Sequence, residues 1–314
     1  MCGVTHAAAS SAEHARLTSR TALLSVAVAV FLVGLKAWAW FTTSSVAMLS
    51  SLADSTLDLA ASLFTLFAVR YAAAPPDREH RYGHGKAEAF AGLMQAGLVA
   101  ISAVLIAVEA IKRFADPQPI SNGLQGIGVM IVSIAATALL ISMQSRAIAR
   151  TGSVATKGDR LHYAADVLSN IAVLLGLAAG AFLGLAWVDA AAALFVVVLL
   201  LHGARKIGAD AANHLLDREV PDETRARIRA LAEADPRIAA VHELRTRTSG
   251  PYMHIQFHAD LDPALTLEAA HAIVVAAEER IRAEFPTADI IIHPDPSGRA
   301  EPHGHEDFEP RAER

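Results

Sequence analysis

Long apolar stretches separated by short charged loops fill the first two thirds of the chain. Six of these stretches are about 20 residues long or longer, the length that an α-helix needs to cross the hydrocarbon core of a bilayer. They cover residues 21–41, 46–72, 87–111, 123–145, 161–183 and 186–204. Because the stretches lack the two-residue alternation of a membrane β-barrel, they predict six transmembrane helices.

After residue 206 the pattern becomes that of a water-exposed domain. Three short runs alternate between apolar and polar positions or are rich in β-branched residues, which is typical of strands, and two amphipathic stretches predict helices. The strands are expected at 238–247, 252–261 and 288–293, and the helices at 221–234 and 265–285. The resulting order αββαβ predicts a small α+β domain with two helices on one face of a three-stranded sheet.

These patterns divide the chain into four segments. The predicted segments are an N-terminal segment (1–20), an all-α transmembrane domain with six helices (21–209), the α+β domain (210–296) and a tail (297–314). The tail is rich in Pro, Glu and Arg and is therefore expected to be disordered.

Composition and charge narrow the class of protein. Apolar residues make up 53% of the chain, charged residues 19%, and the mean hydropathy is +0.36, which indicates a protein of the lipid bilayer. Residues 1–209 carry a net charge of +4 and residues 210–314 one of −9, which together give −5. The acidic second part lacks the clustered basic face that nucleic-acid binding needs. Most Lys and Arg residues of the short loops fall on one side of the predicted spans, which places both termini in the cytoplasm.

Two of the predicted spans contain ionisable residues at helical spacing. Asp54 and Asp58 are four residues apart in the second span, and His162 and Asp166 repeat that spacing in the fifth, so each pair shares one helix face. A charge at the centre of a membrane helix costs about 2.5–3.5 kcal/mol, so three carboxylates need compensation. A divalent cation bound by one imidazole nitrogen and three carboxylate oxygens would supply it, in the tetrahedral geometry that zinc favours. The alternative is a protonated polar cluster that holds the helices together.

The loop between the second and third spans contains a second candidate metal site, formed by Asp77, His80 and His84. The alternative is a solvated charged loop whose histidines bind nothing, and the residues alone favour neither interpretation. The Gly-His-Gly-Lys run at 83–86 is not a phosphate-binding P-loop, because that motif needs Ser or Thr where Ala87 stands.

The α+β domain contains a third set of candidate ligands, which the predicted elements place on its strands, at the end of its last strand and on its long helix. They are His242, His258, His271, His293 and Asp295. Four imidazoles and a carboxylate exceed one tetrahedral shell, so together they would hold two metal ions bridged by Asp295. The alternative is a set of scattered surface histidines.

Several motifs also carry a family resemblance. They are residues 51–58 (SLADSTLD), 77–88 (DREHRYGHGKAE), 162–170 (HYAADVLSN), 241–247 (VHELRTR) and 291–296 (IIHPDP). With these motifs the chain resembles the cation diffusion facilitators, in particular the bacterial branch that exports zinc and ferrous iron. The resemblance extends from the first predicted span to Asp295 and departs from the pattern at Pro294, where close relatives have Gln.

The resemblance implies a homodimer in the bacterial inner membrane, with six spans and a ferredoxin-like cytoplasmic domain in each protomer. It implies export of a divalent metal in exchange for protons, with Zn(II) first and Fe(II) or Cd(II) next, and Zn(II) also bound as a structural or regulatory ion. Transport is assigned to Asp54, Asp58, His162 and Asp166, and the loop set becomes a second metal site. The third set becomes a binuclear site at the dimer interface. Lys86 and Asp217 match positions expected to form a salt bridge between the two domains.

Two functions from other classes fit parts of the sequence. A membrane-anchored binuclear hydrolase would explain paired metals, and a metal-sensing scaffold would explain binding without transport. A hydrolase needs a substrate cleft and a nucleophile, which residues 210–296 do not supply, and it leaves the intramembrane ligands without a role. The sequence therefore predicts a secondary transporter and not an enzyme.

Overall fold

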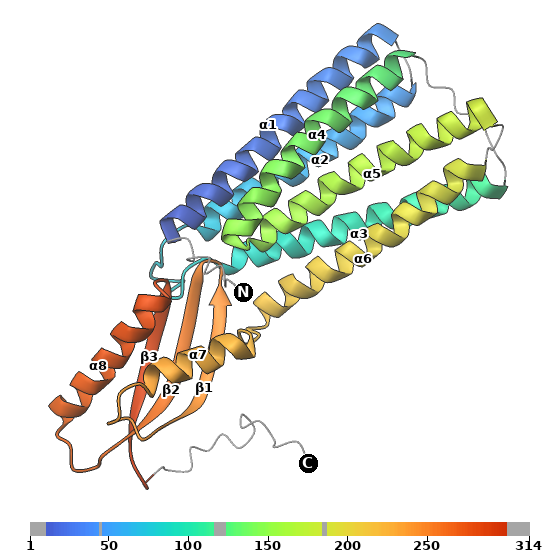
Figure 1. The fold of residues 1–314 in the computed structure, drawn as a ribbon. Helices are drawn as coiled ribbons and strands as arrows, with labels where there is room; N and C mark the ends of the chain where they lie inside the picture. The colour runs from blue at the N-terminus through green and yellow to red at the C-terminus, as the bar shows by residue number, and fades with distance from the viewer. Residues whose placement is uncertain (1–10, 44–45, 116–123, 184–186, 300–314) are drawn as a thin grey trace. The chain divides into compact units, whose positions relative to one another are not determined.

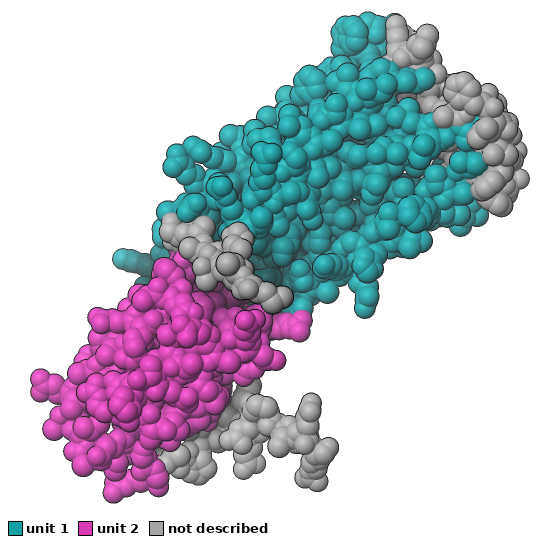
Figure 2. Space-filling model, in the orientation of Figure 1, with its two compact units in different colours: residues 1–215 teal, residues 216–314 magenta. Residues whose placement is uncertain are grey.

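The computed structural model describes residues 11–43, 46–115, 124–183 and 187–299. The chain forms two compact units, residues 1–215 and 216–314 (Figure 2). The described part of the first unit is helical, and the second contains the strands (Figure 1). The boundary predicted at 209/210 falls inside the last helix of the first unit, which continues to Leu215. Residues 1–10 and 300–314, which include parts of the predicted N-terminal segment and of the predicted disordered tail, lie outside the described residues.

The described part of the first unit contains six long helices, one at each of the six predicted spans. They are α1 (Ser11–Thr43), α2 (Val46–Ala72), α3 (Lys86–Ala115), α4 (Leu124–Thr151), α5 (Val154–Leu183) and α6 (Trp187–Leu215). Several extend beyond the apolar stretches. Helix α1 begins ten residues before the predicted span, because residues 11–20 are rich in good helix formers such as Ala, Glu and Arg even though they are polar.

Five of these helices are long and apolar enough to cross a membrane by length and composition: α1, α2, α3, α4 and α6. Helix α5 carries charged residues in its first half. Large apolar side chains such as Phe31, Phe67 and Leu105 point outward and are half exposed or more, while Gln95 and Gln144 are fully buried. A surface of this kind suits lipid, because polar groups hydrogen-bond inside the bundle and apolar groups face outward.

The packing of the helices in the first unit brings α3 and α5 close together. Helix α1 packs against α2 and α4, and α3 packs against α5 and α6 (Figure 1). Helices α3 and α5 come close together at Gly92 and Gly158, where a Cβ added to Gly158 would lie 3.2 Å from Gly92 Cα and 2.9 Å from Gln95 Cβ. Small residues at such a crossing let two backbones approach closely.

The second unit has the predicted order αββαβ. Its elements are α7 (Asp222–Ala232), β1 (Ala240–Ser249), β2 (Tyr252–Leu261), α8 (Leu267–Glu284) and β3 (Ala288–Pro296). The sheet order is β1-β2-β3, with β1 antiparallel and β3 parallel to β2. Both helices contribute to one core with the sheet, in which Ile228, Phe257 and Ile281 are almost completely buried. The unit therefore has a hydrophobic core of its own.

Candidate metal sites

The intramembrane candidate site lies where α2 meets α5. His162 Nε2 is 2.9 Å from Asp58 Oδ1, and one ligand atom from each of Asp58, His162 and Asp166 lies within 4.8 Å of the other two. His162 is buried, and the two carboxylates are partly buried. One imidazole and two carboxylates thus converge from two helices, as a site for a divalent cation requires.

Asp54, the fourth predicted ligand, lies outside this group. It is on α2, one turn before Asp58, and its side chain is exposed. Next to it, Lys36 Nζ from α1 donates to Ser55 Oγ (2.6 Å) and to the carbonyl oxygen of Ser51 (3.3 Å). Lys36 is therefore anchored on α2 in the bundle.

Tyr163 fixes the part of α5 that carries His162. Its side chain is completely buried, its hydroxyl lies 2.7 Å from Ser62 Oγ on α2, and it donates to the carbonyl oxygen of Ser25 on α1 (3.1 Å). These two contacts set the rotation of α5 about its axis, and they keep the neighbouring imidazole directed toward α2. Sequence spacing could not have indicated this supporting contact.

The loop site brings its three predicted residues together. Asp77 Oδ1 lies 3.4 Å from His80 Nδ1, Asp77 Oδ2 lies 3.3 Å from His84 Nε2, and the two imidazole centroids are 4.6 Å apart. The backbone N–H groups of His80 and Glu79 donate to Asp77 Oδ1. The His80 hydrogen bond is the main cause that lowers the pKa of Asp77, so this exposed carboxyl stays ionised and ready to bind a cation.

The three histidines on the strands of the second unit lie side by side across its sheet. His242 on β1 is the register partner of His258 on β2, which is the register partner of His293 on β3. Asp295 is almost completely buried beneath them, with carboxylate oxygens 3.4 Å from His242 Nε2, 2.9 Å from His258 Nδ1 and 3.2 Å from His293 Nε2. One ligand atom from each of His242, His258 and Asp295 lies within 4.8 Å of the other two, so these three residues could hold a metal ion.

His271 on α8 and His293 on β3, the remaining predicted members of this set, are exposed and lie outside the group of mutually close ligand atoms. Two acidic residues that the sequence analysis did not include lie near the histidines instead: Asp260 Oδ1 is 3.3 Å from His242, and Glu243 Oε2 is 3.8 Å from His258. The period-two rule could have found Asp260, since it shares a strand face with His258. Glu243 sits at an irregularity of the β1–β2 pairing with a φ of 48°, where that rule fails.

The predicted salt bridge between Lys86 and Asp217 would join the two units and stays a prediction. Within the first unit, Lys86 Nζ donates to the carbonyl oxygen of Leu215 (3.2 Å). Within the second, Asp217 pairs with Arg247 (3.5 Å).

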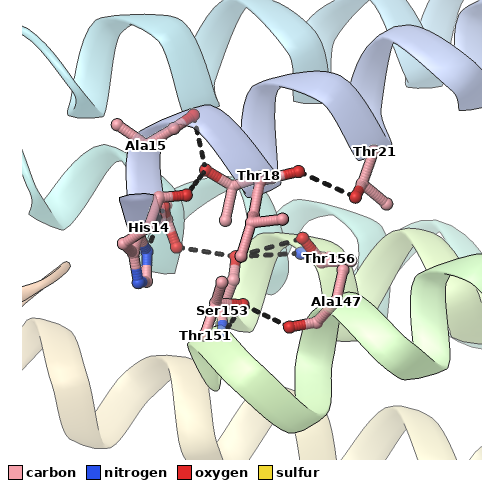
Figure 3. Close-up of polar contacts among 10 residues, drawn as sticks. His14, Ala15, Thr18, Thr21, Ala147, Thr151, Ser153 and Thr156 are labelled. Carbon is pink, nitrogen blue, oxygen red and sulfur yellow. Dashed lines mark hydrogen bonds and ion pairs between the residues drawn. The ribbon is translucent and has the colours of Figure 1, made fainter. Parts of the chain in front are cut away.

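A further polar cluster, which the sequence analysis did not predict, ties the starts of α1, α3 and α5 together. His14 Nε2 lies 3.1 Å from Glu88 Oε1, and Ser153 Oγ donates to Glu88 Oε2 (2.7 Å), all three residues being buried. Figure 3 shows His14 on α1 facing the turn at Ser153 and Thr156. The three helices are thus bound together on the side of the loop site by hydrogen bonds between residues far apart in sequence.

Comparison with known proteins decides the family. The model of the cation efflux transmembrane domain matches residues 22–216, and that of the cation efflux protein cytoplasmic domain matches residues 220–297. The chain belongs to the cation diffusion facilitator family. It is 41% identical over 281 residues to a cation-efflux pump FieF of Shewanella oneidensis, a match that covers 90% of this chain and 94% of the relative. The FieF pump of Pectobacterium atrosepticum is also 41% identical, over 284 residues, with the same coverage.

Family membership confirms the predicted class of function. The protein is a multi-pass inner-membrane transporter that exports divalent cations, and it is not an enzyme. The hydrolase alternative is therefore wrong.

Proposed function

We propose that the protein exports Zn(II) in exchange for protons, with Fe(II) and Cd(II) as further substrates. The observation that carries this proposal is the group of Asp58, His162 and Asp166 inside the helical unit. Zinc and cadmium accept a mixed set of imidazole nitrogen and carboxylate oxygen, whereas manganese and magnesium favour oxygen alone. Asp54 completes a four-ligand shell if α2 and α5 rearrange during transport.

Proton exchange follows from the chemistry of these ligands. A metal ion needs deprotonated carboxylates and a neutral imidazole, so the metal and protons compete for the same atoms. Metal binding from the cytoplasm releases protons, and protons from the opposite side help to release the metal. Because these ligand atoms lie within 4.8 Å of one another, one cation bound among them competes with protons at all three residues.

The cytoplasmic sites support a regulatory role for metal in a homodimer with both termini in the cytoplasm. Ile291 and His293 are more than half exposed on β3, an edge strand of the sheet, so a second copy can cover them. The second part of the chain is acidic, and cations bound at Asp295 would reduce repulsion between two such units. The site of Asp77, His80 and His84 offers a further position for the ion on its way to the membrane site.

The proposal is tested by uptake into sealed vesicles that contain the purified protein and a luminal pH dye. Zn(II), Cd(II), Fe(II) and Mn(II) are added outside, one at a time. We expect uptake of Zn(II) to exceed that of Mn(II) and to make the lumen more alkaline as protons leave in exchange. Uptake of Zn(II) without any change of luminal pH would contradict proton exchange, and faster uptake of Mn(II) would contradict the assigned substrate.

A further inference from the structure

A buried carboxyl group that belongs to none of the three candidate metal sites lies one helical turn before His162. Asp159 on α5 is 1% exposed, and its Oδ2 accepts hydrogen bonds from Ser25 Oγ on α1 (2.6 Å) and Gln144 Nε2 on α4 (2.8 Å). Ser25 and Gln144 are themselves completely buried. Three helices therefore close around this carboxyl group.

The hydrogen bonds of this cluster leave two acceptors without a donor. Among the described residues, Asp159 Oδ1 and Gln144 Oε1 are buried and have no hydrogen-bond partner, while Gln144 Nε2 already donates to both Ser25 Oγ and Asp159 Oδ2. Unpaired buried acceptors are costly. What the cluster lacks is a donor, and a proton on Asp159 Oδ1 supplies one.

The surroundings of Asp159 hold few charges. The titratable groups that face it are His162 and Tyr163 of its own helix, and α1 and α4 present the uncharged Ser25 and Gln144. Arg160, its neighbour on α5, donates to Ser145 Oγ instead (3.2 Å). In the described part of the chain, no Lys or Arg side chain pairs with Asp159 to hold it as a carboxylate.

We propose that Asp159 is a second proton-binding site, which gives up its proton when metal binds to Asp58, His162 and Asp166. A divalent cation one helical turn away favours the ionised form of a carboxyl group. The Oδ1–H bond then breaks, the proton leaves to water on the side of the α5 start, and Ser25 and Gln144 keep the carboxylate hydrogen-bonded. When the metal leaves, the proton returns to Oδ1.

This inference rests on proton exchange and adds a group to it that binds no metal. The test counts protons released per Zn(II) bound by the full-length protein in detergent, in weakly buffered solution with a pH indicator at about pH 7. Asp159→Asn keeps a hydrogen-bond donor at the Oδ1 position but has no proton to release, and Asp159→Ala removes the group altogether. We expect each variant that folds and binds Zn(II) to release about one proton fewer than the wild type.

Ser133→Ala is the matched control, because it removes a buried hydrogen bond of α4 to the carbonyl oxygen of Val129 without removing a titratable group. This control should release as many protons as the wild type. It therefore separates the loss of a buried hydrogen bond, which lowers stability, from the loss of a proton-binding group, which lowers proton release. Equal proton release by wild type and either Asp159 variant would overturn the role of Asp159 while leaving proton exchange intact. Absence of proton release from the wild type would overturn both.

Discussion

His162 Nε2 lies 2.9 Å from Asp58 Oδ1, and this contact joins α5 to α2 inside the helical unit. The two residues are 104 positions apart in the sequence. Asp166 approaches the same point from the next turn of α5. Because these ligands come from two helices, a movement of α5 relative to α2 changes the site directly.

Replacing either carboxylate of this group is expected to abolish transport. Asp58→Ala or Asp166→Ala leaves too few ligands for a divalent cation, so Zn(II) flux into vesicles should fall to background while the protein stays folded by size-exclusion chromatography. Thr56→Ala is the matched control, because Thr56 is exposed on α2 between Asp54 and Asp58 and its hydroxyl donates to the backbone carbonyl of Leu52. Wild-type flux in either Asp variant would remove that residue from the site.

The imidazole of His162 is expected to set the choice of metal. In His162→Asp, a hard oxygen replaces the nitrogen ligand, which should shift preference from Zn(II) and Cd(II) toward Mn(II). Competition between Zn(II) and Mn(II) for uptake measures the shift. An unchanged ranking of metals would show that other residues select the substrate.

Much of this architecture follows from residue patterns. The six helices and the αββαβ order are predicted because apolar runs and alternation are local properties of the chain. The ends of the helices could not be predicted in this way, since α6 continues past Arg205, Lys206 and Asp210 to Leu215, where the apolar run has already ended. The role of Asp159 could not be predicted, because its partners Ser25 and Gln144 are on other helices and no sequence spacing relates them to it. The strand histidines were found because register places like positions of neighbouring strands together.

Zn(II) is expected to stabilise the cytoplasmic unit through the histidines on its sheet. Residues 216–299 have a hydrophobic core of their own, so their melting temperature can be measured with and without metal. At a Zn(II) concentration about 100 times the Kd, binding linkage gives roughly 2.7 kcal/mol of stabilisation. Asp295→Ala should lose most of this gain, and His254→Gln, whose imidazole pairs with Asp289 instead, should keep it. An equal gain in the wild type and Asp295→Ala would place the metal elsewhere.

The close approach of α3 and α5 is expected to be intolerant of a larger side chain. In Gly158→Val, the new Cβ meets Gly92 Cα and Gln95 Cβ closer than atoms normally pack, so the helices must separate and the thermal stability of the full-length protein in detergent should fall. Gly97→Ala is the control, since nothing lies within 4 Å of a Cβ added there. Equal melting temperatures for Gly158→Val and the wild type would show that this crossing is loosely packed.

Acid is expected to weaken the cytoplasmic unit through Asp235. The side chain of Arg237 hydrogen-bonds to Asp235 and is the main cause that lowers its pKa to about 2. Because the folded-state pKa lies below the unfolded value of about 3.9, this pair stabilises the fold at neutral pH, and its contribution is lost as the pH falls from about 4 through about 2. Urea unfolding of residues 216–299 should show a stability difference between the wild type and Asp235→Asn that shrinks over this range. A difference independent of pH would assign the effect to packing.

Proton-driven exchange is tested most directly by Zn(II) flux through the purified protein in sealed vesicles, with the membrane potential clamped and the pH gradient as the single variable. At equal Zn(II) gradients, a pH gradient that drives protons in the direction opposite to the metal should accelerate the flux of Zn(II). Reversing the pH gradient should slow that flux. A flux that follows the Zn(II) gradient alone, at the same rate with and without the pH gradient, would contradict the exchange mechanism.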